Sequence, residues 1–183
     1  MKRLISLLAA AALLCGLFAM PADAARTVDT SGFAAEMLRL VNAEREKAGL
    51  AALGSLAALD AAAQKRAEEI TVLFSHTRPG GGKCFTVLDD YGVDSSSRGE
   101  NIAAGYQTPA EVVAGWMNSS GHRQNILGDY HKLGVGIAVK DGRIHWVQIF
   151  IREGEKKAPA WKSWPPVVQS FARVVLFGWI WMK

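Results

Sequence analysis

The sequence lacks any block of lysine and arginine residues interleaved with aromatic side chains. The formal net charge of the 183 residues is +4, and removing Lys2, Arg3 and Asp23 with the N-terminal segment leaves +3. Nucleic-acid binding needs a concentrated basic surface, so this class of partner is not expected. The weak positive charge is compatible with mild attraction to an anionic cell surface.

The N-terminal apolar run is shorter than a typical membrane-spanning helix. Lys2 and Arg3 precede this uncharged run at residues 4–20, and the small-x-small sequence Ala22-Asp23-Ala24 follows it. The pattern is typical of a secretory signal peptide at residues 1–24 and predicts a secreted or periplasmic protein. An uncleaved membrane anchor is the alternative interpretation.

Cysteine is scarce, because the chain has only Cys15 and Cys84. Cys15 lies inside the expected signal peptide, and the preceding Leu14 is too large for a lipoprotein site. Cys84 is then the one thiol of the exported chain, so no intrachain disulfide is expected and stability must come from packing. Cys84 has no histidine within a few residues, which argues against a catalytic thiol.

The motifs of two common enzyme classes are also missing. No Gly-x-Ser-x-Gly motif is present, and the serines near the histidines have no evident orienting aspartate, so a serine hydrolase has little support. Gly80-Gly81-Gly82 lacks the preceding strand and the spaced lysine of a phosphate-binding loop.

The remaining sequence predicts one globular domain at residues 33–157, after a polar lead-in at residues 25–32. Apolar spacing predicts a helix at residues 33–48 and a second helix, capped by Ser55, that runs to about Leu73. Asn42 and Arg45 are expected on a solvated face of the first helix, and Glu69 is expected to point away from the buried stripe of the second. A polar connector is expected at residues 94–98, followed by a strand near residues 102–106.

Two local signals in the second half of the domain are stronger. Thr108-Pro109-Ala110-Glu111 combines a capping hydroxyl, proline at the first helical position and glutamate three residues after the cap, which predicts a helix start. Because Glu111 has that local role, it is kept out of the candidate site. Apolar runs on both sides of Asp141-Gly142 predict a β-hairpin at residues 133–151.

The C-terminal tail at residues 158–183 is apolar and rich in tryptophan. As a helix, residues 167–182 would measure about 24 Å at 1.5 Å per residue, which is short of a bilayer's hydrocarbon layer. Three interpretations remain open for this tail: a helix packed on the domain, an interfacial helix in peripheral contact with a membrane, and a segment that binds a partner.

Three motifs carry the residues suited to a functional site. His76 lies in Phe74-Ser75-His76-Thr77-Arg78-Pro79, and Glu100 lies in Gly99-Glu100-Asn101. The third motif is Ser119-Ser120-Gly121-His122, followed by Asn125, which is interpreted as structural. Two imidazoles and a carboxylate can bind a divalent ion or transfer a proton if folding brings them together.

The order of these motifs resembles the bacterial branch of the CAP superfamily of cysteine-rich secretory, antigen 5 and pathogenesis-related proteins (SCP-like). The resemblance covers roughly residues 33–151. It includes Trp116-Met117-Asn118-Ser119, Gly134-Val135-Gly136-Ile137 and Trp146-Val147-Gln148-Ile149-Phe150. It implies an α+β fold, a three-layer α-β-α sandwich with a small antiparallel sheet, in which His76, Glu100 and His122 face a common cleft.

The chemistry of these residues leaves two possibilities open. In the first, His76 and His122 hold Zn or Mg, and Glu100 orients or deprotonates a metal-bound water. Catalytic zinc commonly has three protein ligands, however, and this chain offers two obvious ones. The second glutamate of related proteins is also absent, since Met117-Asn118-Ser119 has no carboxylate. In the second, His76, Glu100 and His122 form a buried polar network that joins three loops.

These considerations favour an extracytoplasmic binding module for a lipid, a cell-wall fragment or a protein ligand. The alternative is a metal-dependent hydrolase that acts on peptide or cell-wall bonds. The missing second glutamate favours binding over catalysis.

Overall fold

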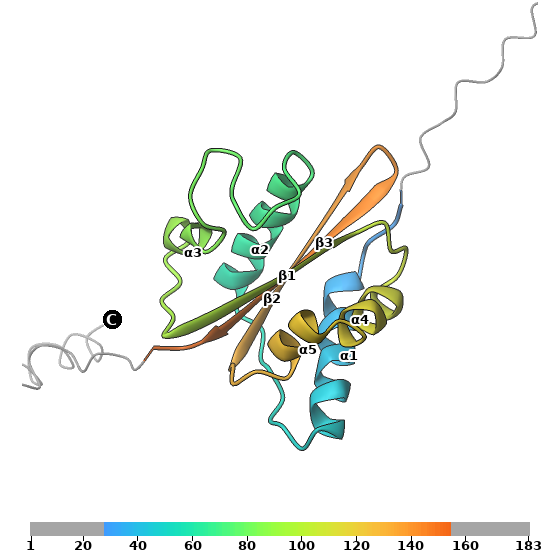
Figure 1. Cartoon of the computed structure of the whole chain (residues 1–183), viewed down its shortest axis with the longest axis vertical. Helices are drawn as coiled ribbons and strands as arrows, with labels where there is room; N and C mark the ends of the chain where they lie inside the picture. The colour runs from blue at the N-terminus through green and yellow to red at the C-terminus, as the bar shows by residue number, and fades with distance from the viewer. Residues whose placement is uncertain (1–27, 155–183) are drawn as a thin grey trace, which may run out of the picture.

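A three-stranded antiparallel sheet with helices on both faces forms the domain (Figure 1). The computed structural model describes residues 28–154, so the expected signal peptide and C-terminal tail lie outside the described residues. No helix within residues 28–154 is both long and apolar enough to cross a bilayer. The elements are α1 (Phe33–Lys47), α2 (Ala57–Ile70), α3 (Thr86–Asp90), β1 (Ser97–Ala104), α4 (Pro109–Met117), α5 (Ser120–Ile126), β2 (Lys132–Lys140) and β3 (Arg143–Arg152).

The strand order β1-β3-β2 puts β3 in the centre, and its two faces build two cores. Ile144, Trp146 and Phe150 of β3 pack toward α1, α4 and α5. Val147, Ile149 and Ile151 alternate with them and pack toward α2 and α3. This period-two alternation on a doubly covered strand confirms the expected α-β-α sandwich.

The β2–β3 hairpin forms as the Asp-Gly signal predicted. Asp141 and Gly142 both have positive φ, 52° and 70°, as a two-residue type I′ turn requires. Helix α2 also packs very closely against strand β2. A Cβ on Gly136 would overlap the Ala63 carbonyl of α2, so only glycine permits this approach.

The predicted capping box at the start of α4 is present. The Thr108 hydroxyl accepts from the Glu111 backbone N–H at 3.2 Å, and the Glu111 carboxylate accepts from the Thr108 N–H at 3.3 Å. Thr108→Ala is therefore expected to lower the free energy of unfolding by about 1 kcal/mol, whereas Thr108→Ser retains the acceptor and most of the stability. Urea unfolding of the two variants measures the difference, and equal losses would contradict the capping role.

Three sequence predictions about element ends are wrong. Ser55 does not cap α2, because its hydroxyl donates to Asp60 at 2.8 Å while Leu56 occupies the cap position without a side-chain bond. α2 ends at Ile70 rather than Leu73. β1 begins at Ser97, within the segment expected to be a connector.

The solvated-face interpretation of the α1 polar residues is also wrong. Arg45 is buried and donates to the carbonyls of Ala51, Ile126 and Gly128 at 2.8–2.9 Å. Asn42 exchanges two hydrogen bonds with the backbone of Leu53. Arg45 thus fixes the C-terminal end of α5 against α1, and α5 is the helix that carries His122.

Candidate functional site

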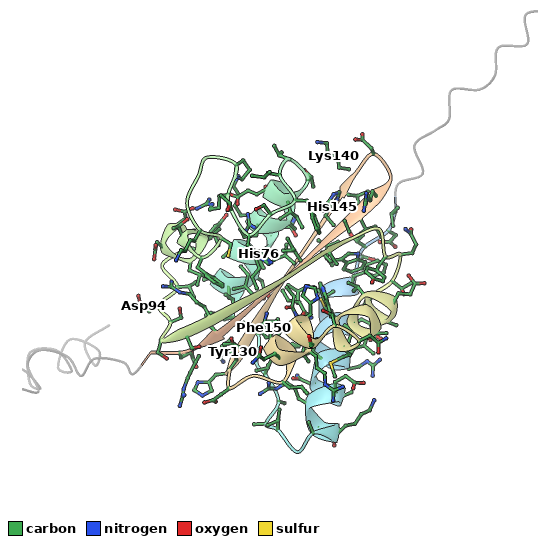
Figure 2. The ribbon with its side chains drawn as sticks, viewed as in Figure 1. His76, Asp94, Tyr130, Lys140, His145 and Phe150 are labelled. Carbon is green, nitrogen blue, oxygen red and sulfur yellow. The ribbon has the colours of Figure 1, made fainter. Side chains whose placement is uncertain are left out.

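His76 lies just past α2, in a segment that folds back on itself. The Cys84 N–H donates to the His76 carbonyl at 2.9 Å, and Thr77 and Lys83 form an isolated antiparallel bridge. The glycine-rich residues 80–82 make the turn between these pairs, as the sequence predicted for a loop. The His76 side chain, 59% exposed, lies on the α2 side of the sheet (Figure 2), with Nδ1 2.7 Å from Oε1 of Glu100.

Glu100 belongs to strand β1 and not to a loop, and its side chain points toward α2. Only 1% of this side chain is exposed. Nε of Arg66 donates to Oε2 at 2.9 Å, and Nη2 of Arg66 lies 3.4 Å from Oε1. Together with His76, these bonds occupy both carboxylate oxygens, so the buried charge of Glu100 is paired.

A chain of ion pairs leads from Glu100 to the molecular surface. Fully buried Arg66 also bonds Glu69 at 2.8 Å, and Arg78 joins Glu69 at 2.7 Å to Asp90 at 2.8 Å. Burial by itself raises the pKa of Glu69, but the bonds from Arg78 and Arg66 outweigh it and hold the pKa below its ordinary value. Glu69, which the sequence placed off the apolar stripe of α2, is thus buried as a member of this ion-pair network.

Sequence reasoning missed Arg66, although a signal for it exists. Arg66 falls on the same helical face as Leu59, Ala63 and Ile70, all of which are buried. A charged residue on an apolar stripe predicts a buried ionic partner, because an unpaired charge would be too costly there. The partner itself, 34 residues further along the chain, could not be identified from spacing.

The far side of β1 is tied to α5 by amide side chains. Nδ2 of Asn125 donates to the Glu100 carbonyl at 3.1 Å and to Oδ1 of Asn101 at 2.8 Å. Nδ2 of Asn101 in turn donates to Oε1 of Gln148 at 3.0 Å and to the His122 carbonyl at 3.2 Å. The structural role expected for Asn125 is thus its observed one, and it fixes α5 beside the strand that carries Glu100.

His122 lies in α5, half-buried, with Nδ1 3.0 Å from the Ser119 hydroxyl and its ring 6.4 Å from that of Trp116. Burial lowers the pKa of His122, and the charge of His76 lowers it further. The two imidazoles therefore influence each other electrostatically. Within residues 28–154, however, His122 makes no hydrogen bond to His76 or Glu100, unlike the directly bonded pair His76 and Glu100.

The His122 pKa can be tested by NMR titration of its imidazole. The folded value should lie below the value in the urea-unfolded chain, and it should rise in His76→Gln because one positive neighbour is removed. Since the folded pKa is the lower one, this group's contribution to stability is complete above the unfolded pKa and is lost as pH falls through the folded value. A His122 midpoint unchanged by His76→Gln would contradict the coupling.

Cys84 is a second residue that the sequence did not assign to the site. The Cys84 side chain is buried. Its sulfur, a ring nitrogen of His76 and a carboxylate oxygen of Glu100 all lie within 4.8 Å of one another. Burial and the neighbouring Glu100 raise the pKa of the thiol to about 12, so at neutral pH the free thiol is protonated and is a poor nucleophile. The sequence did not indicate this proximity, because it results from the fold-back of the chain after His76.

The donor set discriminates between the two expected metals. Imidazole nitrogen, thiol sulfur and carboxylate oxygen are zinc ligands, whereas magnesium requires oxygen ligands in near-octahedral geometry. The residues around Glu100 therefore fit zinc and not magnesium. A surface pocket of about 560 Å³ adjoins the ion pairs and includes Lys65, Val72, Gly81 and the network members Glu69 and Arg78.

Comparison with known proteins gives two curated relatives, both from Bacillus subtilis (strain 168). The uncharacterized protein YkwD is 38% identical over 141 residues, which cover 72% of this chain and 54% of YkwD. The uncharacterized membrane protein YlbC is 36% identical over 120 residues, which cover 64% of this chain and 34% of YlbC. The chain thus spans about half the length of YkwD and a third of YlbC.

Two solved structures share the fold. An extracellular protein containing an SCP domain from Bacillus anthracis str. Ames is 30% identical with a TM-score of 0.62, covering 67% of this chain and 41% of that one. An outer surface protein from Borrelia burgdorferi has a TM-score of 0.63 and covers 69% of this chain and 97% of that one; at 21% identity it supports the fold alone. Residues 38–150 match the family profile described as CAP, cysteine-rich secretory protein family. A match of this extent, with the same sandwich in both structures, shows that the chain belongs to the cysteine-rich secretory protein (CAP) family.

Proposed function

We propose that this domain is an extracytoplasmic binding module whose site is formed by His76, Glu100 and His122. The state of the Glu100 carboxylate carries the proposal. Both oxygens are bonded to Arg66 and Oε1 also contacts His76, while only 1% of the side chain is exposed. A general base must be able to reach water, and this carboxylate is almost completely buried and ion-paired with Arg66. The arrangement supports binding rather than hydrolysis.

The ligand is expected to carry hydrogen-bond acceptors. The exposed imidazole of His76 and the half-buried imidazole of His122 can each donate through a ring N–H. The pocket beside Arg78 adds room for a neighbouring group of the ligand. Carboxylate and phosphate groups of cell-wall fragments or lipid headgroups meet these requirements.

The extracytoplasmic location rests on the N-terminal sequence and on two similar proteins. Residues 1–24 have the pattern of a signal peptide. The two structurally similar proteins are described as an extracellular protein and an outer surface protein. Intact-mass analysis of exported protein tests this, since cleavage after Ala24 leaves a chain that begins at Ala25.

Ligand binding is tested by NMR titration of exported protein with a muramyl peptide and, separately, with a short-chain phosphatidylglycerol. Saturable shifts of the His76 and His122 imidazole signals are expected with one of them. The affinity should fall about tenfold or more in His76→Ala and stay unchanged in His131→Ala, which removes an exposed histidine outside the site. Turnover of the muramyl peptide that disappears in folded Glu100→Gln would establish the hydrolase alternative instead.

A further inference from the structure

We propose that His76, Cys84 and Glu100 form a site for one zinc ion with a thiolate ligand. The binding function proposed above does not require a metal, so the zinc site and the binding function are tested independently. It assigns a role to Cys84, the one cysteine within residues 28–154. With His76 and Glu100, Cys84 makes a set of three protein ligands, the number that zinc commonly has in sites with an open position.

The spacing of the ligand atoms suits a zinc ion. The three atoms lie within 4.8 Å of one another. Zinc bonds of about 2.0–2.3 Å at tetrahedral angles place neighbouring ligand atoms roughly 3.3–3.7 Å apart. Side-chain shifts of about 1 Å therefore bring the set to bonding distance. The His76 side chain is 59% exposed, so solvent can reach the site, and a fourth ligand would be supplied by water or by a bound molecule.

Two of the ligands are held together before any ion binds. The Cys84 N–H bonds the His76 carbonyl, and the Thr77–Lys83 bridge continues this pairing. The backbone therefore holds the His76 and Cys84 main chains side by side. A site whose ligands are held in place by neighbouring structure loses less conformational entropy on binding an ion.

Arg66 supports the third ligand and does not exclude it. Its Nε holds Oε2 of Glu100 at 2.9 Å, while its Nη2 is 3.4 Å from Oε1. Oε1 is thus the oxygen available to a metal, in place of its contact with His76. Metal-bound carboxylates commonly have their second oxygen hydrogen-bonded in this way, which orients the ligand.

Charge balance favours the thiolate over a second histidine. The three carboxylates of the network, on Glu69, Asp90 and Glu100, face the two guanidinium groups of Arg66 and Arg78, so these five groups carry one net negative charge. Zinc adds two positive charges, and formation of the zinc–sulfur bond releases the thiol proton to solvent. The site then becomes neutral, whereas zinc held by His76, His122 and Glu100 would leave one net positive charge.

Cobalt substitution distinguishes these ligand sets. The experiment is a titration of tag-free, metal-free protein with Co²⁺. Cys15 is replaced by serine in any preparation that keeps the N-terminal segment, so that Cys84 is the only thiol. One equivalent should produce a near-ultraviolet sulfur-to-cobalt charge-transfer band together with the visible bands of a tetrahedral ion, and Zn²⁺ should abolish both. Cys84→Ser should remove the charge-transfer band and weaken metal binding about tenfold or more, whereas His122→Ala should keep the band.

Absence of the charge-transfer band from the parent protein, or its persistence in Cys84→Ser, would overturn the proposal. So would loss of the band in folded His122→Ala. If Cys84→Ser does not fold, X-ray absorption of the zinc-loaded parent protein decides the matter, because one sulfur at about 2.3 Å is required. A shell with nitrogen and oxygen only contradicts the site. Neither result changes the outcome of the muramyl-peptide or phosphatidylglycerol titrations of metal-free protein.

Discussion

Replacement of Arg66 with methionine is expected to lower the free energy of unfolding by about 3–5 kcal/mol. Arg66 is fully buried and bonds both Glu69 and Glu100. Methionine fills similar space but leaves the charge of Glu100 buried without its main partner. Urea unfolding monitored by circular dichroism measures the loss.

Two further variants isolate the cause of this loss. Lys65→Met changes the neighbouring residue, whose side chain is 47% exposed, and should alter stability by no more than about 0.5 kcal/mol. Arg66→Met combined with Glu100→Gln should be more stable than Arg66→Met alone, because the unpaired charge is gone. A double variant less stable than the single one would show that lost packing, and not the stranded carboxylate, dominates.

Gly136→Ala is the second substitution with a large expected effect. The added methyl would overlap the backbone of α2 at Ala63 and Gln64, and backbone atoms cannot move aside as a flexible side chain can. α2 must then separate from β2, at an expected cost of about 3 kcal/mol or more. The thermal midpoint should fall by roughly 10 °C or more for a domain of this size.

Gly121→Ala provides the matched control for this substitution. Gly121 lies in the first turn of α5, and no atom comes within 4 Å of an added Cβ. Its thermal midpoint should stay the same or rise slightly, since alanine favours the helix. A similar loss of stability in both variants would contradict the close approach of α2 to β2.

The parts of the fold that sequence predicted correctly depend on local chemistry. Asp141-Gly142 specifies a turn by its backbone preferences, and Thr108 with Glu111 caps a helix through bonds within four residues. The strand β1 was predicted near residues 102–106 but spans Ser97–Ala104, because the polar residues Glu100 and Asn101 do not look like part of a strand that is covered on both faces. Their hydrogen-bond partners, Arg66 and Gln148, come from distant segments, so the usual alternation of apolar residues is absent.

The same distinction separates the parts of the candidate site. His76, Glu100 and His122 could be selected by residue type and by family resemblance, but the elements that hold them could not. All three residues were expected on loops, but only His76 lies in a loop, whereas Glu100 lies in strand β1 and His122 in helix α5. Arg66 and Cys84 enter only through tertiary contacts, one from the buried face of α2 and the other from the fold-back beyond His76.

The side chains that anchor α4 and α5 also protect the rim of the sheet. β1 is an edge strand, and the carbonyls of Glu100 and Ile102 accept from Asn125 at 3.1 Å and from the Trp116 indole at 3.4 Å. An uncovered edge would offer these groups to a strand of another molecule and so promote self-association. Because two of its carbonyls are bonded to side chains of its own chain, this edge is a poorer template for intermolecular β-pairing, which suits a domain proposed to work beyond the reach of cytosolic chaperones.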